Sequence, residues 1–253
     1  MMNNPSKPLV DEILLARDLG FDYLDLTLEP PATGSEGFNR ERARKALAKA
    51  GLPVVGHTGW HLPGNAAYPE VRQGVVASLS WALEHFAALG ARTMTYHIQG
   101  AVARYVGIEA AIAAQAEVLA AVAVRAEKRG MTVVLEHTSA WPEQFRILDE
   151  LFRRVPALGF HLDVGHANLA PDRKHHTAEF IRRYGRRLCH VHFSDNRGAG
   201  DDHLPLGVGT VPWPEVVRIL RRRGYSAGVT LETFSADHDY LRLSLEKARA
   251  WFA

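Results

Sequence analysis

Short apolar runs alternate with longer amphipathic segments along the whole chain. The short runs are rich in β-branched and aromatic residues and end at turn-forming residues, as buried strands do. The pattern predicts seven strands, which are Phe21–Leu28, Pro53–Thr58, Arg92–Ile98, Thr132–Thr138, Gly159–Val164, Leu188–Ser194 and Ala227–Thr233. The segments between them have the spacing of helices, so the chain consists of repeated strand–helix units.

Several helices can be placed by the residues at their ends. An alanine-rich pattern predicts a helix over Ala110–Lys128. Pro142 is suited to begin a helix that continues through Phe145–Val155, because proline is favoured in the first helical turn. Pro214 has the same place before Val216–Arg223, and the following glycine is suited to end that helix.

Repeated strand–helix units predict a parallel sheet with right-handed crossovers. No linker-like segment divides the chain, so we expect residues 1–253 to form a single α/β domain, a (β/α)8 TIM barrel. The helix expected at Leu9–Leu19 should follow a first strand, and only Met2–Pro8 is available for it. We therefore expect that first strand to be short, irregular or missing.

Composition agrees with this fold and excludes several other classes of protein. The length of 253 residues suits one such barrel, and 47% hydrophobic with 23% charged residues excludes a disordered chain. No apolar run is long enough to cross a bilayer, and the first residues lack the apolar core of a secretion signal. With one cysteine, Cys189, we expect a cytoplasmic protein without a membrane partner.

Charge and missing motifs narrow the chemistry further. A net charge of only +2 argues against a surface built for nucleic acid. No lysine lies at a predicted strand end, which argues against a Schiff-base enzyme. The chain has neither a Walker A motif nor a strand-linked dinucleotide motif. The 13 histidines are therefore the best lead, because histidine is the commonest metal ligand.

Histidines and carboxylates gather at the carboxyl ends of six successive predicted strands. A single such histidine is more often a hydrogen-bonded core residue, but the ends of barrel strands converge on one mouth. Imidazole and carboxylate groups suit Zn²⁺, Mn²⁺, Fe²⁺ or Co²⁺ better than Ca²⁺. The groups are His57, His97, Glu136, Asp163, His166, His190, His192 and Glu232. The loop after the strand expected at Leu188–Ser194 adds Asp201, Asp202 and His203.

Strand alternation leaves some of these positions open. His161 and Asp163 share one strand face, as do His190 and His192, and periodicity does not decide which member points into the mouth. His161 is either a mouth residue or a partner of Asp163. His137 should face away from Glu136.

The remaining candidates are expected to have structural roles. We expect the adjacent histidines 175 and 176, with His85 and His238, at the surface, whereas His61 could line the mouth beside Trp60. The Gly207–Gly209 turn could expose backbone N–H groups to an anion, but an ordinary turn is the expected reading.

Five motifs in fixed order carry a resemblance to a known group of proteins. They are LEHT, HLDVGHAN, HVHFSDN, DDHLPLGVG and LETF. Together they resemble the xylose isomerase-like TIM barrels, which include sugar phosphate isomerases and epimerases, ketose 3-epimerases and endonuclease IV. The resemblance extends over nearly the whole chain from Leu9 onward.

The resemblance to the epimerases implies a divalent-metal-dependent isomerase or epimerase. Its substrate would be a small sugar or sugar phosphate, altered by enediolate-type proton transfer. One ion would be held by Glu136, Asp163, His192 and Glu232. Glu136 and Glu232 would also exchange the proton as base and acid. His166, Arg197 and Trp60 would contact the substrate.

The resemblance to endonuclease IV implies an alternative, a metal-dependent phosphodiesterase acting at abasic sites in DNA. That family uses three metal ions and nine ligands, which match His57, His97, Glu136, Asp163, His166, His192, Asp201, His203 and Glu232. The cofactor expected from both resemblances is Mn, Zn, Co or Fe, with one to three ions per chain. The near-neutral charge favours a sugar as partner, nucleic acid is expected only under the alternative, and a homo-oligomer is possible.

Overall fold

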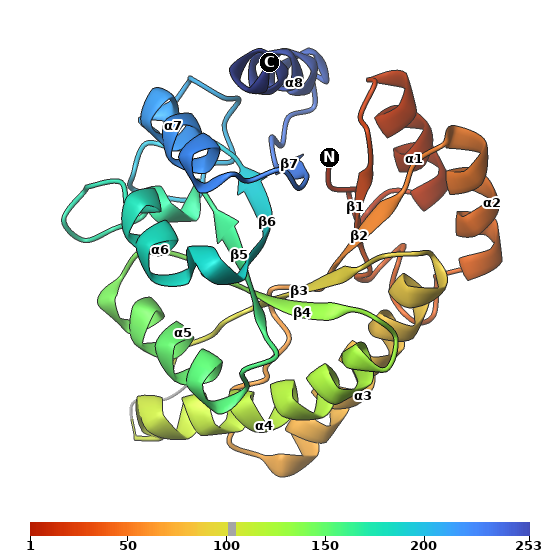
Figure 1. Cartoon of the computed structure of the whole chain (residues 1–253). Coiled ribbons are helices and arrows are strands. Elements are labelled where there is room, and N and C mark those ends of the chain that lie inside the picture. Colours follow the sequence, from red (N-terminus) through yellow and green to blue (C-terminus); the bar gives the residue numbers. More distant parts are fainter. Residues whose placement is uncertain (101–104) are drawn as a thin grey trace. The chain divides into compact units, whose positions relative to one another are not determined.

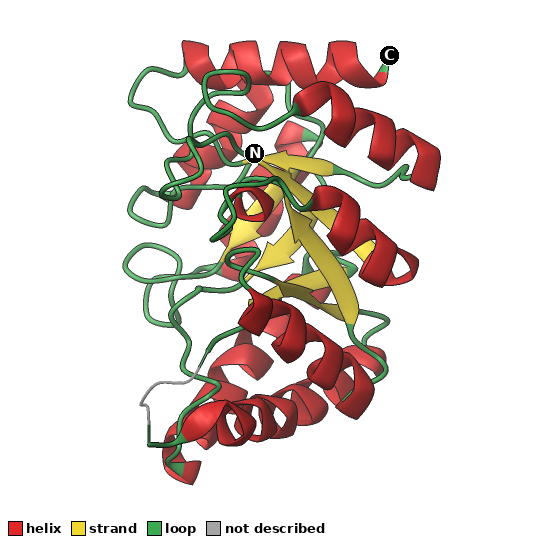
Figure 2. Ribbon diagram, turned by 90° about the vertical axis from the view of Figure 1, so that its left-hand side faces the viewer, coloured by secondary structure: helices red, strands yellow, loops and turns green. Residues whose placement is uncertain are grey.

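The computed structural model describes residues 1–100 and 105–253. Contacts group this part of the chain into two compact units. Unit 1 contains Met1–Leu135 and Arg146–Leu158, and unit 2 contains Glu136–Phe145 and Gly159–Ala253. Parallel strands are followed by helices in both units (Figures 1 and 2). The expectation of one domain over the whole chain stays a prediction.

Unit 1 contains the first strands in sequential order. They are β1 (Leu24–Thr27), β2 (Val54–His57), β3 (Thr93–His97) and β4 (Thr132–Glu136), whose last residue begins unit 2. The helices are α1 (Leu9–Asp18), α2 (Arg40–Ala50), α3 (Pro69–Ala88), α4 (Gly107–Glu127) and most of α5 (Pro142–Arg154). The register of β1 and β2 pairs Thr27 with His57, so that their carboxyl ends lie side by side.

The expected first strand is reduced to a single bridge. Met2 makes one parallel bridge to Asp25, whose N–H donates to the carbonyl of Met1 at 2.8 Å. The Asn3 side chain then replaces the ladder, because its Oδ1 accepts the N–H of Thr27 at 2.7 Å. Pro5 follows two residues later and cannot donate a ladder hydrogen bond. The prediction of a short, irregular first strand is confirmed.

Helix α4 is long and apolar enough, by length and composition, to cross a bilayer. Half of its most apolar stretch is nevertheless buried inside the protein. Its Glu117 accepts hydrogen bonds from Arg72 of the neighbouring helix α3, at 2.9 and 3.1 Å. This is the pattern of a core helix with one polar face.

Unit 2 contains three parallel strands and their helices. The strands are β5 (Gly159–Asp163), β6 (Leu188–Phe193) and β7 (Val229–Leu231), and the helices are α6 (Thr177–Tyr184), α7 (Trp213–Arg223) and α8 (Asp239–Phe252). The register pairs His161 with His190 and Asp163 with His192. On the next strand His192 pairs with Thr230. Polar residues of neighbouring strands therefore lie opposite one another in the sheet register.

All seven predicted strands are present, each inside the run that predicted it. Helix α5 begins at Pro142, as expected. Helix α7 begins at Trp213 and ends at Gly224, whose φ of 70° is the left-handed conformation that glycine adopts most easily.

The Gly207–Gly209 turn is an ordinary structural turn, built around a buried carboxylate. Asp195 accepts the backbone N–H groups of Gly207 at 2.8 Å and of Val211 at 3.1 Å. It also accepts the indole N–H of Trp213 at 2.9 Å. A side chain at Gly209 would collide with the carbonyl oxygen of Asn196. The ordinary turn expected from the sequence is therefore found, and its N–H groups bind the protein's own carboxylate.

Candidate metal centre

Four potential metal ligands meet inside unit 2. They come from successive strand ends, namely Glu136 of β4, Asp163 of β5, His192 of β6 and Glu232 just after β7. One nitrogen or oxygen atom from each lies within 4.8 Å of the others, and all four residues are buried. The ends of parallel strands thus gather the groups that the sequence singled out.

Strand register positions these groups. Asp163 and His192 are directly paired neighbours on β5 and β6. The backbone N–H of Glu232 donates to the carbonyl of Phe193 at 3.0 Å, which continues the ladder beyond β7. His192 Nδ1 then lies 3.1 Å from Glu232 Oε1. The same nitrogen is 3.8 Å from Glu136 Oε1 and 3.9 Å from Asp163 Oδ2.

The electrostatics of the cluster favour a cation. Burial raises the pKa of Asp163, and the nearby carboxylates of Glu232 and Glu136 raise it further against the opposing charge of His166. Burial also opposes ionisation of Glu232, but the charge and hydrogen bond of His192 outweigh it and lower the pKa of Glu232. Several buried carboxyl groups thus lie close together, and a bound cation would stabilise their ionised forms.

The donor set fits a divalent ion. Asp163 Oδ1 accepts the backbone N–H of His166 at 2.6 Å, whereas its buried Oδ2 accepts no hydrogen bond from the described residues. A buried carboxylate oxygen without a donor is unfavourable unless a cation binds it. Three carboxylates and one imidazole match the preferences of Mn²⁺, Zn²⁺, Co²⁺ or Fe²⁺. These four residues could therefore hold such an ion.

A second cluster in unit 2 is formed by His166, Asp201 and His203. Asp201 Oδ2 lies 3.0 Å from Nε2 of each histidine. Burial opposes the charge of both histidines, but the carboxylates around them outweigh it. The pKa of His166 is raised well above its ordinary value, and that of His203 is raised to about 9. Burial likewise opposes ionisation of Asp201, yet both histidines lower its pKa.

Both ring nitrogens of each of these histidines face oxygen acceptors. His166 Nδ1 is 2.8 Å from the carbonyl of His137, and His203 Nδ1 is 3.2 Å from the carbonyl of Glu232. Since Nε2 of each faces Asp201, an imidazolium that donates from both nitrogens satisfies every contact.

Two further histidines, His161 and His190, lie beside the four candidate ligands. The ring of His161 lies 4.0 Å from that of His192 and 4.7 Å from that of His190, between centroids. His161 Nδ1 is 3.4 Å from Glu136 Oε2. Thr230 Oγ1 is 3.2 Å from His190 Nε2. His161 thus lies beside the carboxylate of Glu136, and the two roles left open for it stay predictions.

Unit 2 thus brings together seven of the predicted metal and substrate residues. His57 and His97 end β2 and β3 in unit 1, where their ring centroids are 5.0 Å apart. Trp60, also in unit 1, is 68% exposed. Arg197 is exposed in unit 2, and its backbone N–H donates to Asp202 at 3.2 Å. The roles predicted for these four residues stay predictions.

The remaining histidines show where sequence reasoning succeeded and failed. His137 faces away from Glu136, as expected, and stacks on Phe180 with centroids 3.8 Å apart. The surface position expected for His175 is wrong, because this residue is half-buried and its Nε2 lies 2.8 Å from the hydroxyl of Thr177. His85 is also half-buried, against the ring of Trp81.

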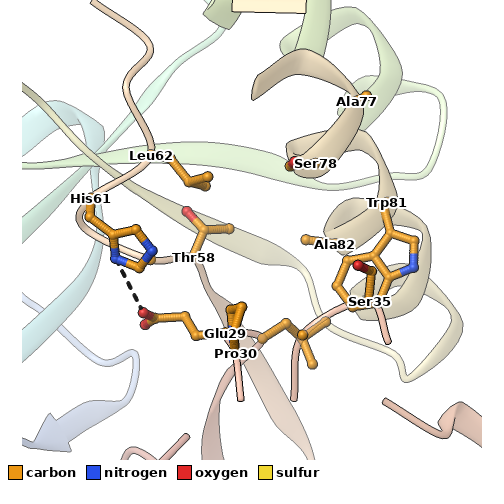
Figure 3. Close-up of a pocket in the computed structure, with 13 residues that line it drawn as sticks. Glu29, Pro30, Ser35, Thr58, His61, Leu62, Ala77, Ser78, Trp81 and Ala82 are labelled. Atoms are coloured by element: carbon orange, nitrogen blue, oxygen red, sulfur yellow. Dashed lines mark ion pairs between the residues drawn. The ribbon is translucent and has the colours of Figure 1, made fainter. Parts of the chain in front are cut away.

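Sequence reasoning overlooked one carboxylate at a strand end. Glu29 follows β1 by two residues, which is the same signal that drew attention to Asp163 and Glu136. No histidine is adjacent to it in the sequence, so the pattern of paired ligands did not include it. In unit 1 it lines a pocket together with His61 (Figure 3).

Two curated proteins match part of this chain. An uncharacterised protein of Methanocaldococcus jannaschii is 37% identical over 78 residues, which are 30% of this chain and 25% of that protein. Fructoselysine 3-epimerase of Escherichia coli is 33% identical over 75 residues, 28% of this chain and 27% of the epimerase. The matched part spans about a quarter of the length of each relative.

Solved structures match nearly the whole chain. A D-tagatose 3-epimerase-like protein has a TM-score of 0.80 at 22% identity, covering 97% of this chain and 94% of its own. D-allulose 3-epimerase of a Methylomonas species has a TM-score of 0.77 at 20% identity, covering 96% and 91%. An AP endonuclease, family 2, of Brucella melitensis has a TM-score of 0.74 at 19% identity, covering 96% and 94%. This likeness confirms the predicted TIM barrel fold.

A family model described as "Xylose isomerase-like TIM barrel" matches residues 13–252. The match includes all seven strands and every residue of the four-ligand cluster. The ordered motifs predicted this group from the sequence alone. This chain belongs to the xylose isomerase-like TIM barrel family.

Proposed function

We propose that this protein is a divalent-metal-dependent isomerase or epimerase of a small sugar or sugar phosphate. The observation that carries the proposal is the buried cluster of Glu136, Asp163, His192 and Glu232, with one potential ligand atom from each within 4.8 Å of the others. Sugar 3-epimerases among the solved structures with this fold support the same class of reaction.

The four residues would hold one ion, with Mn²⁺, Co²⁺, Zn²⁺ or Fe²⁺ as candidates. When bound, the ion would act as a Lewis acid on neighbouring substrate oxygens and stabilise negative charge on them. The chain supplies the groups that move the proton. Glu136 and Glu232 each have two carboxylate oxygens, so one oxygen can serve as ligand while the other exchanges a proton at a substrate carbon.

Neighbouring groups would hold these carboxylates in place. His161 Nδ1 lies 3.4 Å from one oxygen of Glu136, and His166 Nδ1 lies 3.6 Å from the other. His192 lies against Glu232 at 3.1 Å. An enediolate-type transfer needs a base and an acid fixed on the substrate, and fixed carboxylates suit this need better than mobile ones.

The second cluster would serve the isomerase as a set of hydrogen-bond donors. In unit 2 the ring nitrogens of His166 and His203 face Asp201 and carbonyl oxygens. The three-ion pattern uses the same two histidines as metal ligands, so the number of bound ions separates the two functions. The phosphodiesterase keeps the support of the nine matching positions and of one structural neighbour.

The proposal can be tested by proton exchange with solvent. Purified protein is treated with chelator, reloaded with Mn²⁺ or Co²⁺, and incubated in D₂O with D-fructose, D-tagatose and D-allulose and their phosphates. We expect deuterium to enter one of these sugars next to its carbonyl carbon, as detected by NMR, because the proposed transfer passes through the solvent-exchangeable carboxylates. We also expect about one ion per chain by elemental analysis.

Glu136→Gln is the decisive variant, because it keeps size and polarity but removes the base. It should abolish exchange while the melting temperature stays near that of the wild type. Glu143→Gln, in the first turn of α5, is the matched control and should keep full activity. About three ions per chain and cleavage of an abasic oligonucleotide would instead establish the phosphodiesterase.

A further inference from the structure

A pocket in unit 1 is lined by a mixture of charged, polar, aromatic and apolar side chains. Its volume is about 390 Å³, which is within the range of small-molecule sites. Three segments form it (Figure 3): the loop after β1, the loop after β2 and one face of α3. We propose that this pocket binds a small organic ammonium ion with a compact apolar body.

Glu29 supplies the recognition group. Its side chain is only 15% exposed, yet no described residue donates a hydrogen bond to its carboxylate. Its one ion-pair neighbour in the described chain is His61, whose Nδ1 is 3.6 Å away and whose side chain is 53% exposed. That separation is too long for a hydrogen bond. The carboxylate therefore keeps free acceptor capacity that the donors of a ligand can fill.

The pocket is held open by contacts that do not depend on a ligand. The N–H of Glu29 donates to the hydroxyl of Thr33 at 3.1 Å, and that hydroxyl in turn donates to the carbonyl of Thr27 of β1 at 3.0 Å. On the second loop, the hydroxyl of Thr58 donates to the carbonyl of Thr95 at 2.6 Å. Both loops are thus pinned to the strands, and little ordering is needed when a ligand binds.

Gly59 lets the acidic end of the pocket form. A Cβ atom at this position would lie 3.0 Å from Glu29 Oε2 and 3.0 Å from His61 Cε1. The carboxylate and the imidazole therefore rest directly on the glycine backbone. This close approach keeps Glu29 turned toward the pocket, beside His61 (Figure 3).

The opposite side of the pocket is apolar. Trp81 of α3 lies across from His61, with Leu62 and Pro30 among the walls between them (Figure 3). An indole face attracts cations through its quadrupole and also packs well on apolar groups. A carboxylate at one end and an indole at the other are complementary to an ammonium group on an apolar body.

A sugar fits this pocket less well than an amine. Most of the wall area is apolar, and of the polar side chains in it the hydroxyl of Thr58 is already used by Thr95. A monosaccharide would bury several hydroxyl groups without partners, which is unfavourable. An ammonium group instead concentrates its donors at Glu29 and forms a charged hydrogen bond with its carboxylate.

Benzylamine, protonated at neutral pH, is the probe, and calorimetric titration of the full chain is the measurement. We expect saturable binding of benzylamine and about tenfold weaker binding of benzyl alcohol, because a charged hydrogen bond is stronger than a neutral one by about that factor. Glu29→Gln should weaken benzylamine binding about tenfold, since it removes only the charge. Glu36→Gln, an exposed carboxylate of the same loop, is the matched control and should leave the affinity unchanged.

A second variant protects the test against misfolding. Ser78→Trp places a bulky ring at the exposed rim of the pocket and should remove benzylamine binding while the thermal melt stays like that of the wild type. Equal binding of benzylamine and benzyl alcohol would overturn the proposal, as would equal losses in Glu29→Gln and Glu36→Gln. Saturable binding of D-fructose that Glu29→Gln removes, without binding of benzylamine, would identify a polyol pocket and overturn it as well.

Discussion

His161 Nδ1 lies 3.4 Å from Glu136 Oε2, and both side chains are buried. His161 precedes Asp163 by two residues on β5, so both side chains lie on the same face of that strand. That face therefore carries the candidate ligand Asp163 and a neighbour of the candidate ligand Glu136. Groups that contact a metal-ligating carboxylate orient it and tune its basicity. This contact makes His161 a positioning residue for the proposed centre.

His161→Asn should weaken metal binding about 10–100-fold, which is the usual loss when a group supporting a ligand is removed. The measurement is a calorimetric titration of the chelator-treated protein with Mn²⁺. The control is His175→Asn, another histidine of unit 2, whose Nε2 contacts Thr177 and none of the four candidate ligands. Equal losses of Mn²⁺ affinity in the two variants would show that His161 has no specific role.

Binding of Mn²⁺ should also stabilise the folded protein. A ligand at about 100 times its Kd adds about 2.7 kcal/mol to the free energy of unfolding, and for a chain of this size that raises Tm by about 5–10 °C. Asp163→Asn should lose this shift, because the variant removes one ligand charge from the cluster. Melting curves with and without Mn²⁺ provide the measurement.

The matched variant for this experiment is His97→Gln. His97 is a ligand only in the three-ion pattern, so the one-ion centre predicts that His97→Gln keeps the full Mn²⁺ shift. Loss of the shift in His97→Gln as well as in Asp163→Asn would contradict the one-ion centre.

Sequence pattern was sufficient for the regular elements of the fold. Buried strands produce apolar β-branched runs, so all seven strands lie where the runs predicted them. The conformation of the segment before α1 was harder to predict from the sequence. It depends on hydrogen bonds between the Asn3 side chain and the backbone of Thr27 rather than on β-propensity. The division of contacts into two units has no signature in composition or linkers.

The candidate site was predictable to the same extent. Parallel strand ends lie at one edge of a sheet, so ligand-type residues at those ends could be grouped without coordinates. The oxygen that each histidine faces could not be predicted from the sequence, since it depends on side-chain torsions and strand register. His161 therefore lies beside Glu136 rather than pairing with Asp163 alone. Likewise, the pocket at Glu29 exists only because α3 packs near the loop that follows β1.

Asp195 should be among the most important residues for stability outside the candidate centre. Its buried carboxylate accepts hydrogen bonds from Asn196, Gly207, Val211 and Trp213. Asp195→Ala leaves these donors unsatisfied, and the expected loss is about 3–5 kcal/mol in the free energy of unfolding. Urea unfolding measures this loss. Glu246→Ala, at an exposed position of α8, should stay within about 0.5 kcal/mol of the wild type.

His175 should make stability depend on pH. Burial lowers its pKa in the folded protein to about 4, from the ordinary value of 6.5. Between these values the unfolded chain binds a proton that the folded chain does not, so stability falls as pH drops from 6.5 toward 4. Above pH 6.5 the effect vanishes. Because the side chain is half-buried, we expect the loss attributable to it to be about 1–3 kcal/mol.

The test compares the wild type with His175→Asn by urea unfolding at neutral pH and at mildly acidic pH. Carboxyl groups also titrate on acidification, but they do so in both proteins, so the difference between the two isolates His175. His175→Asn should lose less stability on acidification than the wild type, by about 1–3 kcal/mol. His238→Gln, at the start of α8, should behave as the wild type does. Parallel acid sensitivity in His175→Asn and the wild type would mean that burial of His175 does not govern this dependence.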